Sequence, residues 1–424
     1  MLTNTYLPHV GGVARSVAAF SAAYRCRGHR VLVVAPEFEG QPAQEADVVR
    51  VPAIQNFNGS DFSAPLPVSG LLNDELDAFQ PDIVHSHHPY LLGMTAVRIA
   101  RYRSLPLVFT HHTLYEHYTH YVPADSPVFR RFVIELAVRY ANLSDRVFTP
   151  SESIAELLRQ RGVTSPLEVV PTGVEVARFA QGDGMGFRRR HRVPAEAFVV
   201  GHLGRLAPEK NLEFLGRAVA RFLRVEPEVW LLLIGTGPSV EVVQAIFEAA
   251  GVSERVRYAG VLRAAEELAD AYHAMDVFAF ASKSETQGMV LTEAMAAGVP
   301  VVGLDAPGVR EVVRDRQNGR LLQDESVDAF SEALMWIYRL SRSERRHLRE
   351  QARATAEAFS MARTADKALA CYEQLIAQER ETKTDADEQW QRVLNLLKAE
   401  WAIIRGMAAA AGAALGEPGS DPAS

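Results

Sequence analysis

Cysteine is nearly absent from this 424-residue sequence, which contains only Cys26 and Cys371. Two cysteines cannot build a disulfide framework or a cysteine metal site, and such scarcity is typical of a reducing compartment. No apolar run approaches the roughly 18 residues of a membrane-spanning helix. The N-terminus also lacks the charged and apolar regions of a secretion signal. We therefore expect a cytoplasmic protein.

The sequence also lacks a strong excess of charge of one sign. It carries 45 Lys and Arg residues against 52 Asp and Glu residues, a formal net charge of −7. This balance disfavours nucleic-acid binding, so any site for phosphate groups must be local. Because 424 residues exceed one ordinary core, we expect two domains of about 150 to 200 residues and a tail.

The stretch from Ser282 to Val302 holds two carboxylates with an informative spacing. An apolar run precedes it, a polar turn with Gly288 follows, and a helical pattern then ends at Gly298, which predicts strand, loop, helix and strand. Glu285 falls in the loop and Glu293 in the helix. Carboxylates so far apart are better placed to accept hydrogen bonds from two hydroxyls of one ligand than to share a proton.

The helix that begins after Gly288 adds a second expectation. The amides of Met289 and Val290 would open this helix, where they and the helix dipole favour a phosphate. Phosphate groups and hydroxyls occur together in a nucleotide sugar, which is the ligand that this pattern indicates. The alternative is that Glu285 is an ordinary loop carboxylate and Glu293 a solvated helix residue.

Apolar strand-like runs alternate with helical patterns in both halves of the chain. This alternation predicts an α/β protein whose parallel sheets are covered on both faces. Gly11 and Gly12 open the first helix, so their amides could approach a diphosphate closely, although a simple turn explains them equally well. Few residues precede this loop, from which we expect the native start to lie slightly upstream.

Histidine is unusually frequent between residues 85 and 120. A metal site is one interpretation, because His85 and His87 would share one face of a strand. No carboxylate or cysteine recurs at ligand spacing, so we predict no metal site. The histidines of this region are His85, His87, His88, His111, His112, His117 and His120.

The second half begins with a strand at 198–203 and the loop GRLAPEKN. Arg205 and Lys210 on this loop would lie at the carboxyl edge of a parallel sheet and suit a pyrophosphate, although such loops are also common solvated turns. Gly235 and Gly237 resemble part of a dinucleotide fingerprint. The third glycine and the acidic residue after it are missing, so we predict no NAD binding.

Three of these segments resemble motifs of the retaining glycosyltransferases of family 4, enzymes of the GT-B fold. The Glu-x7-Glu motif of this family resembles the stretch ETQGMVLTEAMAAGVPVV, and its GR-x4-K motif resembles GRLAPEK. The segments in which the family's N-terminal strands lead into loops resemble DIVHSHHP and VFTHHT. The resemblance covers about residues 5–375. It implies two Rossmann-like domains whose parallel sheets face a cleft, followed by a C-terminal helical extension.

The resemblance assigns roles to single residues. In the family motif the histidine before the threonine reaches the donor sugar and its phosphate, which indicates His112, with His111 as the alternative if the register shifts by one. Glu285 would hold sugar hydroxyls and Glu293 the ribose. The catalytic candidates are His112, Arg205, Lys210 and Glu285, and the donor-binding candidates are Gly11, Gly12, Arg205, Lys210, Val261, Leu262, Glu285, Gly288, Met289, Val290 and Glu293.

The expected reaction transfers a hexose from UDP- or GDP-hexose to a hydroxyl with retention of configuration, without a cofactor or metal. A subgroup of the family that glycosylates diacylglycerol has motifs that resemble THHTLYEHYTHYVP and SETQG of this chain. We therefore expect a membrane lipid as the acceptor. A soluble or polyprenyl-linked glycan is the alternative acceptor. A noncatalytic nucleotide-sugar-binding protein is the alternative of another class.

The same considerations divide the chain. We expect an N-terminal acceptor-side domain at 1–175, a linker at 176–195, a C-terminal donor domain at 196–360 and a crossover helix at 361–378. The remainder, 379–424, is predicted to contain a charged linker, an amphipathic helix and a frayed tail from Ala408.

The predicted helix at 389–407 carries an apolar stripe at spacings of four and three. This stripe would pack on the enzyme, pair two subunits, or lie on a membrane surface that holds a lipid acceptor. In the last case the protein would be peripheral on the inner face of the cytoplasmic membrane. The stripe consists of Trp390, Leu394, Leu397, Trp401 and Ile404.

Overall fold

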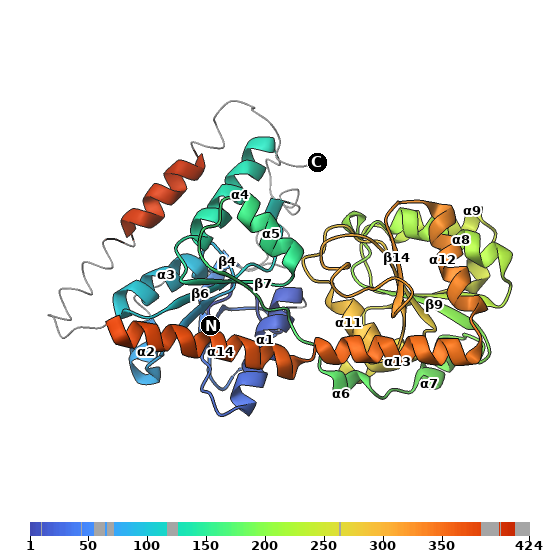
Figure 1. Ribbon diagram of the computed structural model, residues 1–424, viewed down its shortest axis with the longest axis horizontal. Coiled ribbons are helices and arrows are strands. Elements are labelled where there is room, and N and C mark those ends of the chain that lie inside the picture. The colour runs from blue at the N-terminus through green and yellow to red at the C-terminus, as the bar shows by residue number, and fades with distance from the viewer. Residues whose placement is uncertain are drawn as a thin grey trace. The chain divides into compact units, whose positions relative to one another are not determined.

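A computed structural model shows how the chain folds. It describes residues 1–9, 11–43, 45–54, 64–65, 72–116, 126–262, 264–382, 398 and 400–411. The chain divides into two compact units, whose helices and strands are labelled in Figure 1. Unit 1 comprises Met1–Pro171 and Ala365–Ser424, and unit 2 comprises Thr172–Thr364.

Unit 1 contains parallel sheets. Four strands pair in the order β5-β6-β7-β8, and β1 pairs with β2. Leu2 joins the two groups because it bridges Val34 of β1 and Ser86 of β5. The strands are β1 (Val33–Pro36), β2 (Val48–Val51), β5 (Val84–Ser86), β6 (Leu107–Thr110), β7 (Arg146–Thr149) and β8 (Leu167–Val169), with β3 (Ala53–Ile54) and β4 (Ala64–Pro65) as a separate antiparallel pair.

The helices of unit 1 begin where the sequence offers suitable caps. Ser126 precedes α4 and accepts a hydrogen bond from the amide of Phe129 at 3.1 Å, and Ser151 caps α5 in the same way. Strands β1, β5 and β6 are buried at every residue, as expected for strands covered on both faces, whereas β8 is only partly buried. The helices are α1 (Gly12–Cys26), α2 (Asn73–Phe79), α3 (Leu92–Arg103), α4 (Pro127–Ala141), α5 (Glu152–Gln160) and most of α14 (Met361–Thr382).

Unit 2 is built on a six-stranded parallel sheet in the order β11-β10-β9-β12-β13-β14. The first strand of this unit, β9, therefore lies in the middle, and the strand order reverses between β9 and β12. In open parallel sheets, ligands bind at the carboxyl ends of the strands beside this point of reversal. The strands are β9 (Phe198–Leu203), β10 (Val229–Ile234), β11 (Val256–Gly260), β12 (Val277–Phe280), β13 (Val301–Leu304) and β14 (Gly319–Leu322).

Helices cover both faces of this sheet. Neighbouring residues of one strand enter different cores, because side chains alternate between the faces: Val199 belongs to one cluster and Val200 to the other. The helices are α6 (Val176–Phe179), α7 (Gly184–Arg190), α8 (Leu212–Val225), α9 (Val240–Ala249), α10 (Ala265–His273), α11 (Met289–Ala296), α12 (Val327–Arg339) and α13 (Arg342–Ala358), with the 3-10 turns η4 (Pro208–Lys210) and η5 (Ser253–Arg255).

The segment 176–195, expected to be a linker, instead forms α6 and α7 within unit 2. Phe179 and Phe187 are buried in its core at 2% and 1% exposure. Arg188 is also buried and donates to the carbonyl oxygens of Ala274, Ala195 and Ala197. Glycines are typical of linkers, but here Gly182 and Gly184 allow close packing against residues 269–274.

The C-terminal extension includes a helix at 400–411 that packs on unit 1 (Figure 1). Ile403 is buried at 4% in the unit 1 core, and Glu400 is paired with Arg98 of α3. The predicted apolar stripe is therefore not the packing face here, since Trp401 and Ile404 are 66% and 58% exposed. The helix also extends beyond the predicted end at 407, while Trp390, Leu394 and Leu397 lie outside the described residues.

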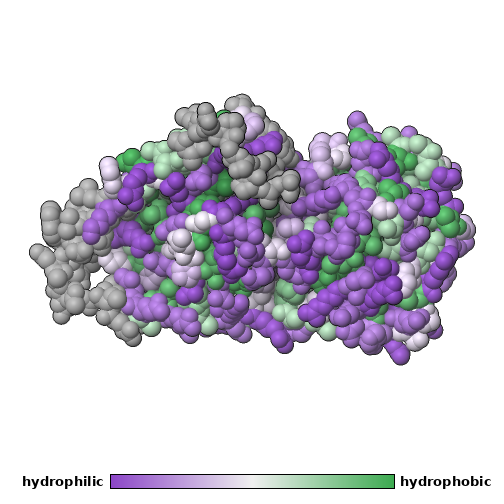
Figure 2. Space-filling model, turned by 45° about the horizontal axis from the view of Figure 1, so that its top comes forward, coloured by the Kyte–Doolittle hydropathy of each residue, from purple (hydrophilic) through white to green (hydrophobic). Residues whose placement is uncertain are grey.

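The surface shown in Figure 2 is largely hydrophilic, with apolar side chains exposed among the polar ones. Among the described helices, none is both long and apolar enough to span a membrane.

Replacing Arg188 should strongly destabilise unit 2. Its guanidinium also pairs with Asp276 at 2.9 Å, and the Arg188 side chain is only 9% exposed. Arg188→Leu would leave this carboxylate and three carbonyl groups without their partner, which should lower the free energy of unfolding by about 3 kcal/mol or more. Urea unfolding followed by circular dichroism measures the change.

The neighbouring Arg189→Leu is the matched control, because the Arg189 side chain is 72% exposed. We expect a change within about 0.5 kcal/mol for this variant. Equal stability of the two variants would show that the Arg188 contacts do not stabilise the fold.

Candidate functional site

Two predicted motifs meet at the carboxyl ends of β9 and β12, which are neighbouring strands. Lys210, at the end of η4, donates a hydrogen bond to the carboxylate of Glu285 in the loop after β12. The side chains are 20% and 16% exposed, so the pair is largely shielded from water. The arrangement places a cation and a carboxylate at the point where the strand order reverses.

Hydrogen bonds between the two loops hold this ion pair in place. The hydroxyl groups of Ser282 and Ser284 donate to the carbonyl oxygen of Glu209 at 3.3 and 3.2 Å. Because Glu209 directly precedes Lys210, these bonds fix the backbone on both sides of the pair. The serines were not singled out in the sequence, where only their place in a polar turn was evident.

The helix α11 begins four residues after Glu285, at Met289. Its N-cap, Gly288, has a φ of +71°, and a Cβ there would lie 2.9 Å from Leu291 Cδ1. A side chain at this position would therefore be both strained and crowded. The amides of Met289 and Val290 lie in the first turn, where a helix has no internal acceptors for them. This helix end is suited to bind an anion beside the Lys210 ammonium.

Glu293 lies inside α11 and is 4% exposed. Its Oε2 accepts a hydrogen bond from the hydroxyl of Tyr272 in α10 at 2.9 Å, and Tyr272 is fully buried. The solvated-helix alternative for Glu293 is thus wrong. Tyr272 could not be predicted as part of this site, since one tyrosine among core residues carries no functional signal.

The other donor candidates of unit 2 also follow its strands. Arg205 comes two residues after β9 and is exposed. Val261 and Leu262 directly follow β11, and Val261 is 49% exposed. Because carboxyl ends of parallel strands share one edge of a sheet, these residues lie on the same edge as Lys210 and Glu285.

Histidines gather at the corresponding edge of the unit 1 sheet. His87 follows β5 and His112 follows β6, and His87 Nδ1 lies 2.9 Å from His112 Nε2 with the rings stacked at 24°. Burial lowers the pKa of His112 to about 3 and that of His87 well below its usual value. Both imidazoles are therefore neutral at pH 7, so one ring donates its N–H to the other.

A second set of contacts, made by His85, supports the His87 ring. His85 in β5 is 4% exposed; its Nε2 lies 2.7 Å from Thr110 Oγ1 and its Nδ1 lies 2.5 Å from the hydroxyl of Tyr372 in α14. The His85 ring also packs on His87, with centroids 4.1 Å apart. Tyr372 could not be predicted, because it is 287 residues away from His85 in the sequence.

The two histidines left open by the sequence differ in their surroundings. His111 is 2% exposed, its amide donates to the carbonyl of Phe148, and its ring packs against Phe109 and Tyr115. His112 is only half-buried. These surroundings favour a structural role for His111 and leave His112 as the candidate that can reach a ligand.

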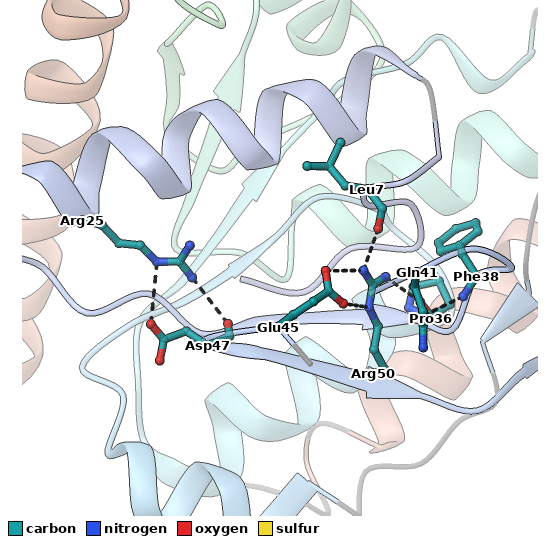
Figure 3. Close-up of polar contacts among 8 residues, drawn as sticks. All are labelled: Leu7, Arg25, Pro36, Phe38, Gln41, Glu45, Asp47 and Arg50. Atoms are coloured by element: carbon teal, nitrogen blue, oxygen red, sulfur yellow. Dashed lines mark hydrogen bonds and ion pairs between the residues drawn. The ribbon is translucent and has the colours of Figure 1, made fainter. Parts of the chain in front are cut away.

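The glycine loop before α1 is held by an arginine (Figure 3). Arg50 forms two hydrogen bonds with Glu45, at 2.6 and 2.8 Å, and donates to the carbonyl oxygens of Pro36 and Leu7. Leu7 lies just before Gly11 and Gly12, which are the N-cap and first residue of α1. The Arg50 contacts therefore hold Leu7, which lies four residues before the N-cap Gly11, and the sequence carried no signal for them.

Comparison with known proteins now identifies the family. A model of Glycosyltransferase Family 4 matches residues 10–178, and a model of glycosyl transferases group 1 matches residues 186–355. The chain belongs to glycosyltransferase family 4. This confirms the prediction from the motifs, and the family members use nucleotide sugars as donors.

Curated relatives include glycolipid and mannosyl transferring enzymes. The chain is 29% identical over 351 residues to an alpha-monoglucosyldiacylglycerol synthase of Streptococcus pneumoniae, covering 79% of this chain and 78% of that protein. It is 30% identical to a GDP-mannose-dependent alpha-mannosyltransferase of Mycolicibacterium smegmatis, covering 89% and 97%. Both relatives are named as enzymes that transfer a sugar.

Solved structures show the fold. Anabaena Alr3699/HepE, in complex with UDP and glucose, aligns with a TM-score of 0.69 and 21% identity over 88% of this chain and 99% of that one. WaaG, a glycosyltransferase involved in lipopolysaccharide biosynthesis, aligns with a TM-score of 0.64 and 18% identity over 88% and 99%. The predicted GT-B fold is confirmed.

His112→Ala should reduce kcat/KM for transfer by about 10² or more, because the group expected to contact the donor sugar and its phosphate would be lost. The wild-type to variant ratio should not change between pH 5 and 8, since the pKa of His112 is about 3 and its charge stays constant in that range. Steady-state kinetics at several pH values measure both.

His111→Ala is the comparison variant. Removal of a buried ring should lower its melting temperature more than that of His112→Ala, with a much smaller loss of kcat/KM in the folded protein. A larger kinetic loss for His111→Ala would reverse the assignment.

Proposed function

We propose that this glycosyltransferase moves a hexose from UDP- or GDP-hexose to a hydroxyl of a membrane lipid such as diacylglycerol. The anomeric configuration is retained and no metal takes part. The observation that carries the proposal is the Lys210–Glu285 pair at the reversal of strand order, where Glu285 lies three residues before the N-cap of α11. A donor has a diphosphate for the cation and helix end, and a sugar for the carboxylate.

The leaving diphosphate is stabilised by groups of unit 2. Lys210 and the exposed Arg205 supply positive charge, and the first amides of α11 supply hydrogen bonds where negative charge develops. Donor binding transfers the Lys210 ammonium from Glu285 to a phosphate oxygen, and Glu285 then accepts hydrogen bonds from sugar hydroxyls. The buried Glu293, oriented by Tyr272, accepts from the ribose.

Retention follows from attack on the face that the diphosphate leaves. The bond between the anomeric carbon and the phosphate oxygen breaks, and the acceptor oxygen bonds to that carbon on the same side. The acceptor proton passes to the departing diphosphate, so no protein nucleophile is required. The protein contributes positioning and electrostatic stabilisation, and the neutral His112 supplies a hydrogen bond to the sugar and its phosphate.

The acceptor assignment is supported by the sequence and a relative. Ser284 to Gly288 form the SETQG wording of the diacylglycerol subgroup, and a matched relative is named as a monoglucosyldiacylglycerol synthase. The mannosyltransferases among the relatives favour a second candidate, transfer of mannose from GDP-mannose to a soluble or polyprenyl-linked glycan. A noncatalytic donor-binding protein is distinguished by the absence of turnover.

The proposal is tested by measuring nucleoside diphosphate release from UDP-glucose, UDP-galactose and GDP-mannose, with and without diacylglycerol in detergent micelles. We expect release that depends on diacylglycerol and a glycolipid product whose proton NMR shows the donor's anomeric configuration. An inverted product would contradict retention, and release that requires a glycan instead of the lipid would support the second candidate.

The same assay with EDTA tests the metal. The sequence has one Asp-x-Asp, at Asp385 and Asp387, which lies outside the described residues and outside both family matches. We expect full activity in EDTA. Loss of turnover that magnesium or manganese restores would contradict the metal-free mechanism.

A peripheral membrane location fits the outer face of the helix at 400–411. Trp401, Ile404 and Met407 are 66%, 58% and 46% exposed there, with Lys398 and Arg405 exposed beside them. Tryptophan and aliphatic side chains enter the membrane interface, and the cations favour anionic lipids. The opposite face already packs on unit 1 through Ile403, which would hold the apolar side chains outward. We propose that this face docks on the cytoplasmic membrane.

Trp401→Ala combined with Ile404→Ala should lower the affinity for phosphatidylglycerol-containing liposomes at least about tenfold. The reason is that insertion of these two apolar side chains into the membrane interface would contribute a few kcal/mol to binding. Activity on acceptor in detergent should remain. Co-sedimentation measures binding, and Met185→Ala with Val242→Ala, two exposed apolar residues of unit 2, is the control. Undiminished binding by the Trp401 and Ile404 variant would exclude this helix as the anchor.

A further inference from the structure

Gln287 makes an unusual pair of contacts in the loop between Glu285 and α11. Its Oε1 accepts a hydrogen bond from the amide of Thr172 at 2.7 Å, and its Nε2 donates to the carbonyl oxygen of Thr172 at 2.6 Å. The two residues are 115 positions apart and are 6% and 7% exposed. The side-chain amide thus satisfies both peptide groups of one residue, as a neighbouring strand would.

Thr172 lies where the chain passes from unit 1 into unit 2. The return passage follows Thr364, and the two connecting segments are hydrogen-bonded to each other within unit 2. Val174 donates its amide to the carbonyl of Phe359 at 2.9 Å and accepts from the amide of Met361 at 2.9 Å. The connecting segments therefore form a single bonded ribbon.

Close packing at Gly173 tightens this ribbon. A Cβ there would lie 2.3 Å from Met361 Cα and 2.4 Å from Thr364 Oγ1, so no side chain fits without displacing backbone. The segment is consequently fixed on one side by α14 and on the other by Gln287. A shift of the segment would have to break the contacts of Gln287 or move that residue with it.

The loop at 282–288, which we name the donor loop, is also confined by the loop after β13. A Cβ on Gly308, in the loop after β13, would lie 2.7 Å from the backbone nitrogen of Gln287, and Gly308 has a φ of +78°. Gln287 is two residues from Glu285 and adjacent to the N-cap Gly288. Displacement of Gln287 is thus transmitted directly to the Glu285 carboxylate and the first amides of α11.

We propose that Gln287 is a positioning residue that couples the donor loop to the segment connecting the two units. The proposal rests on the proposed function, because it assigns Glu285 and α11 to the donor. Binding of the donor to this loop would restrict the backbone motion of Thr172 through the two Gln287 hydrogen bonds. Loss of these bonds would displace the Glu285 carboxylate.

The side-chain amide of Gln287 supplies both a donor and an acceptor to Thr172 at every pH. In Gln287→Glu, a protonated carboxyl can imitate the amide, since its O–H donates to the carbonyl and its C=O accepts from the N–H. An ionised carboxylate faces the Thr172 carbonyl with no proton to donate. Burial raises the pKa of such a carboxyl, which moves its titration towards neutral pH. Gln287→Leu provides neither bond at any pH.

Kinetics on the full chain test the positioning role. We expect Gln287→Leu to lose at least about 30-fold in kcat/KM for the donor at all pH values. Gln287→Glu should lie within about threefold of wild type at pH 5.5 and fall at least tenfold further by pH 8.5. Gln351→Leu, an exposed glutamine on α13, should match wild type. Rates are normalised to the folded fraction from circular dichroism, so a residue that acts on stability alone would show no change.

Hydrogen–deuterium exchange tests the coupling without requiring transfer. Addition of saturating UDP or GDP to wild type should slow exchange both at residues 285–290 and at 172–174 by at least about fivefold. In Gln287→Glu at pH 8.5 the slowing at 172–174 should disappear.

The outcomes separate the two claims. Protection at 285–290 without any change at 172–174 in wild type overturns the coupling and leaves the donor assignment standing. No protection at 285–290 with either nucleotide overturns the donor assignment and this proposal together. A Gln287→Glu variant whose normalised activity is independent of pH would overturn the positioning role.

Discussion

The ion pair between Lys210 and Glu285 is the interaction around which the candidate site of unit 2 is arranged. It forms only because β9 and β12, which are separated by two strands and three helices in sequence, are neighbours in the sheet. Their carboxyl ends bring a cation, a carboxylate and the N-terminus of α11 to one place. A parallel sheet whose strand order reverses there leaves room for a ligand, so topology creates the site before any side chain is chosen.

Unit 1 uses burial instead of paired charge. His85, His87 and His112 form a contiguous group at the ends of β5 and β6, with Tyr372 from α14 at its base. Because burial lowers the pKa of each of these histidines, the group presents neutral hydrogen-bonding nitrogens near pH 7. A neutral donor or acceptor can bind a sugar hydroxyl without the cost of removing a charge from water.

Glycine and buried polar groups connect these sites to the rest of the fold. Gly173 and Gly308 permit backbone approaches that any side chain would block, and Gln287 bonds Thr172 while its own backbone lies close to Gly308. The same rule applies to Arg188, which satisfies three carbonyl groups in the core of unit 2. Buried peptide groups need partners, so these few polar side chains determine how neighbouring loops are placed.

The sequence by itself determined the alternation of strands and helices, the family, and the residues at strand ends such as Arg205 and Glu285. These are local properties, carried by periodicity and short motifs. Only the tertiary structure decided that 176–195 is packed helix, that Glu293 bonds Tyr272, that His111 is enclosed while His112 is half-buried, and that Gln287 pairs with Thr172. Each of these features depends on which distant residues become neighbours. The chain topology determines this, and no local sequence pattern encodes the topology.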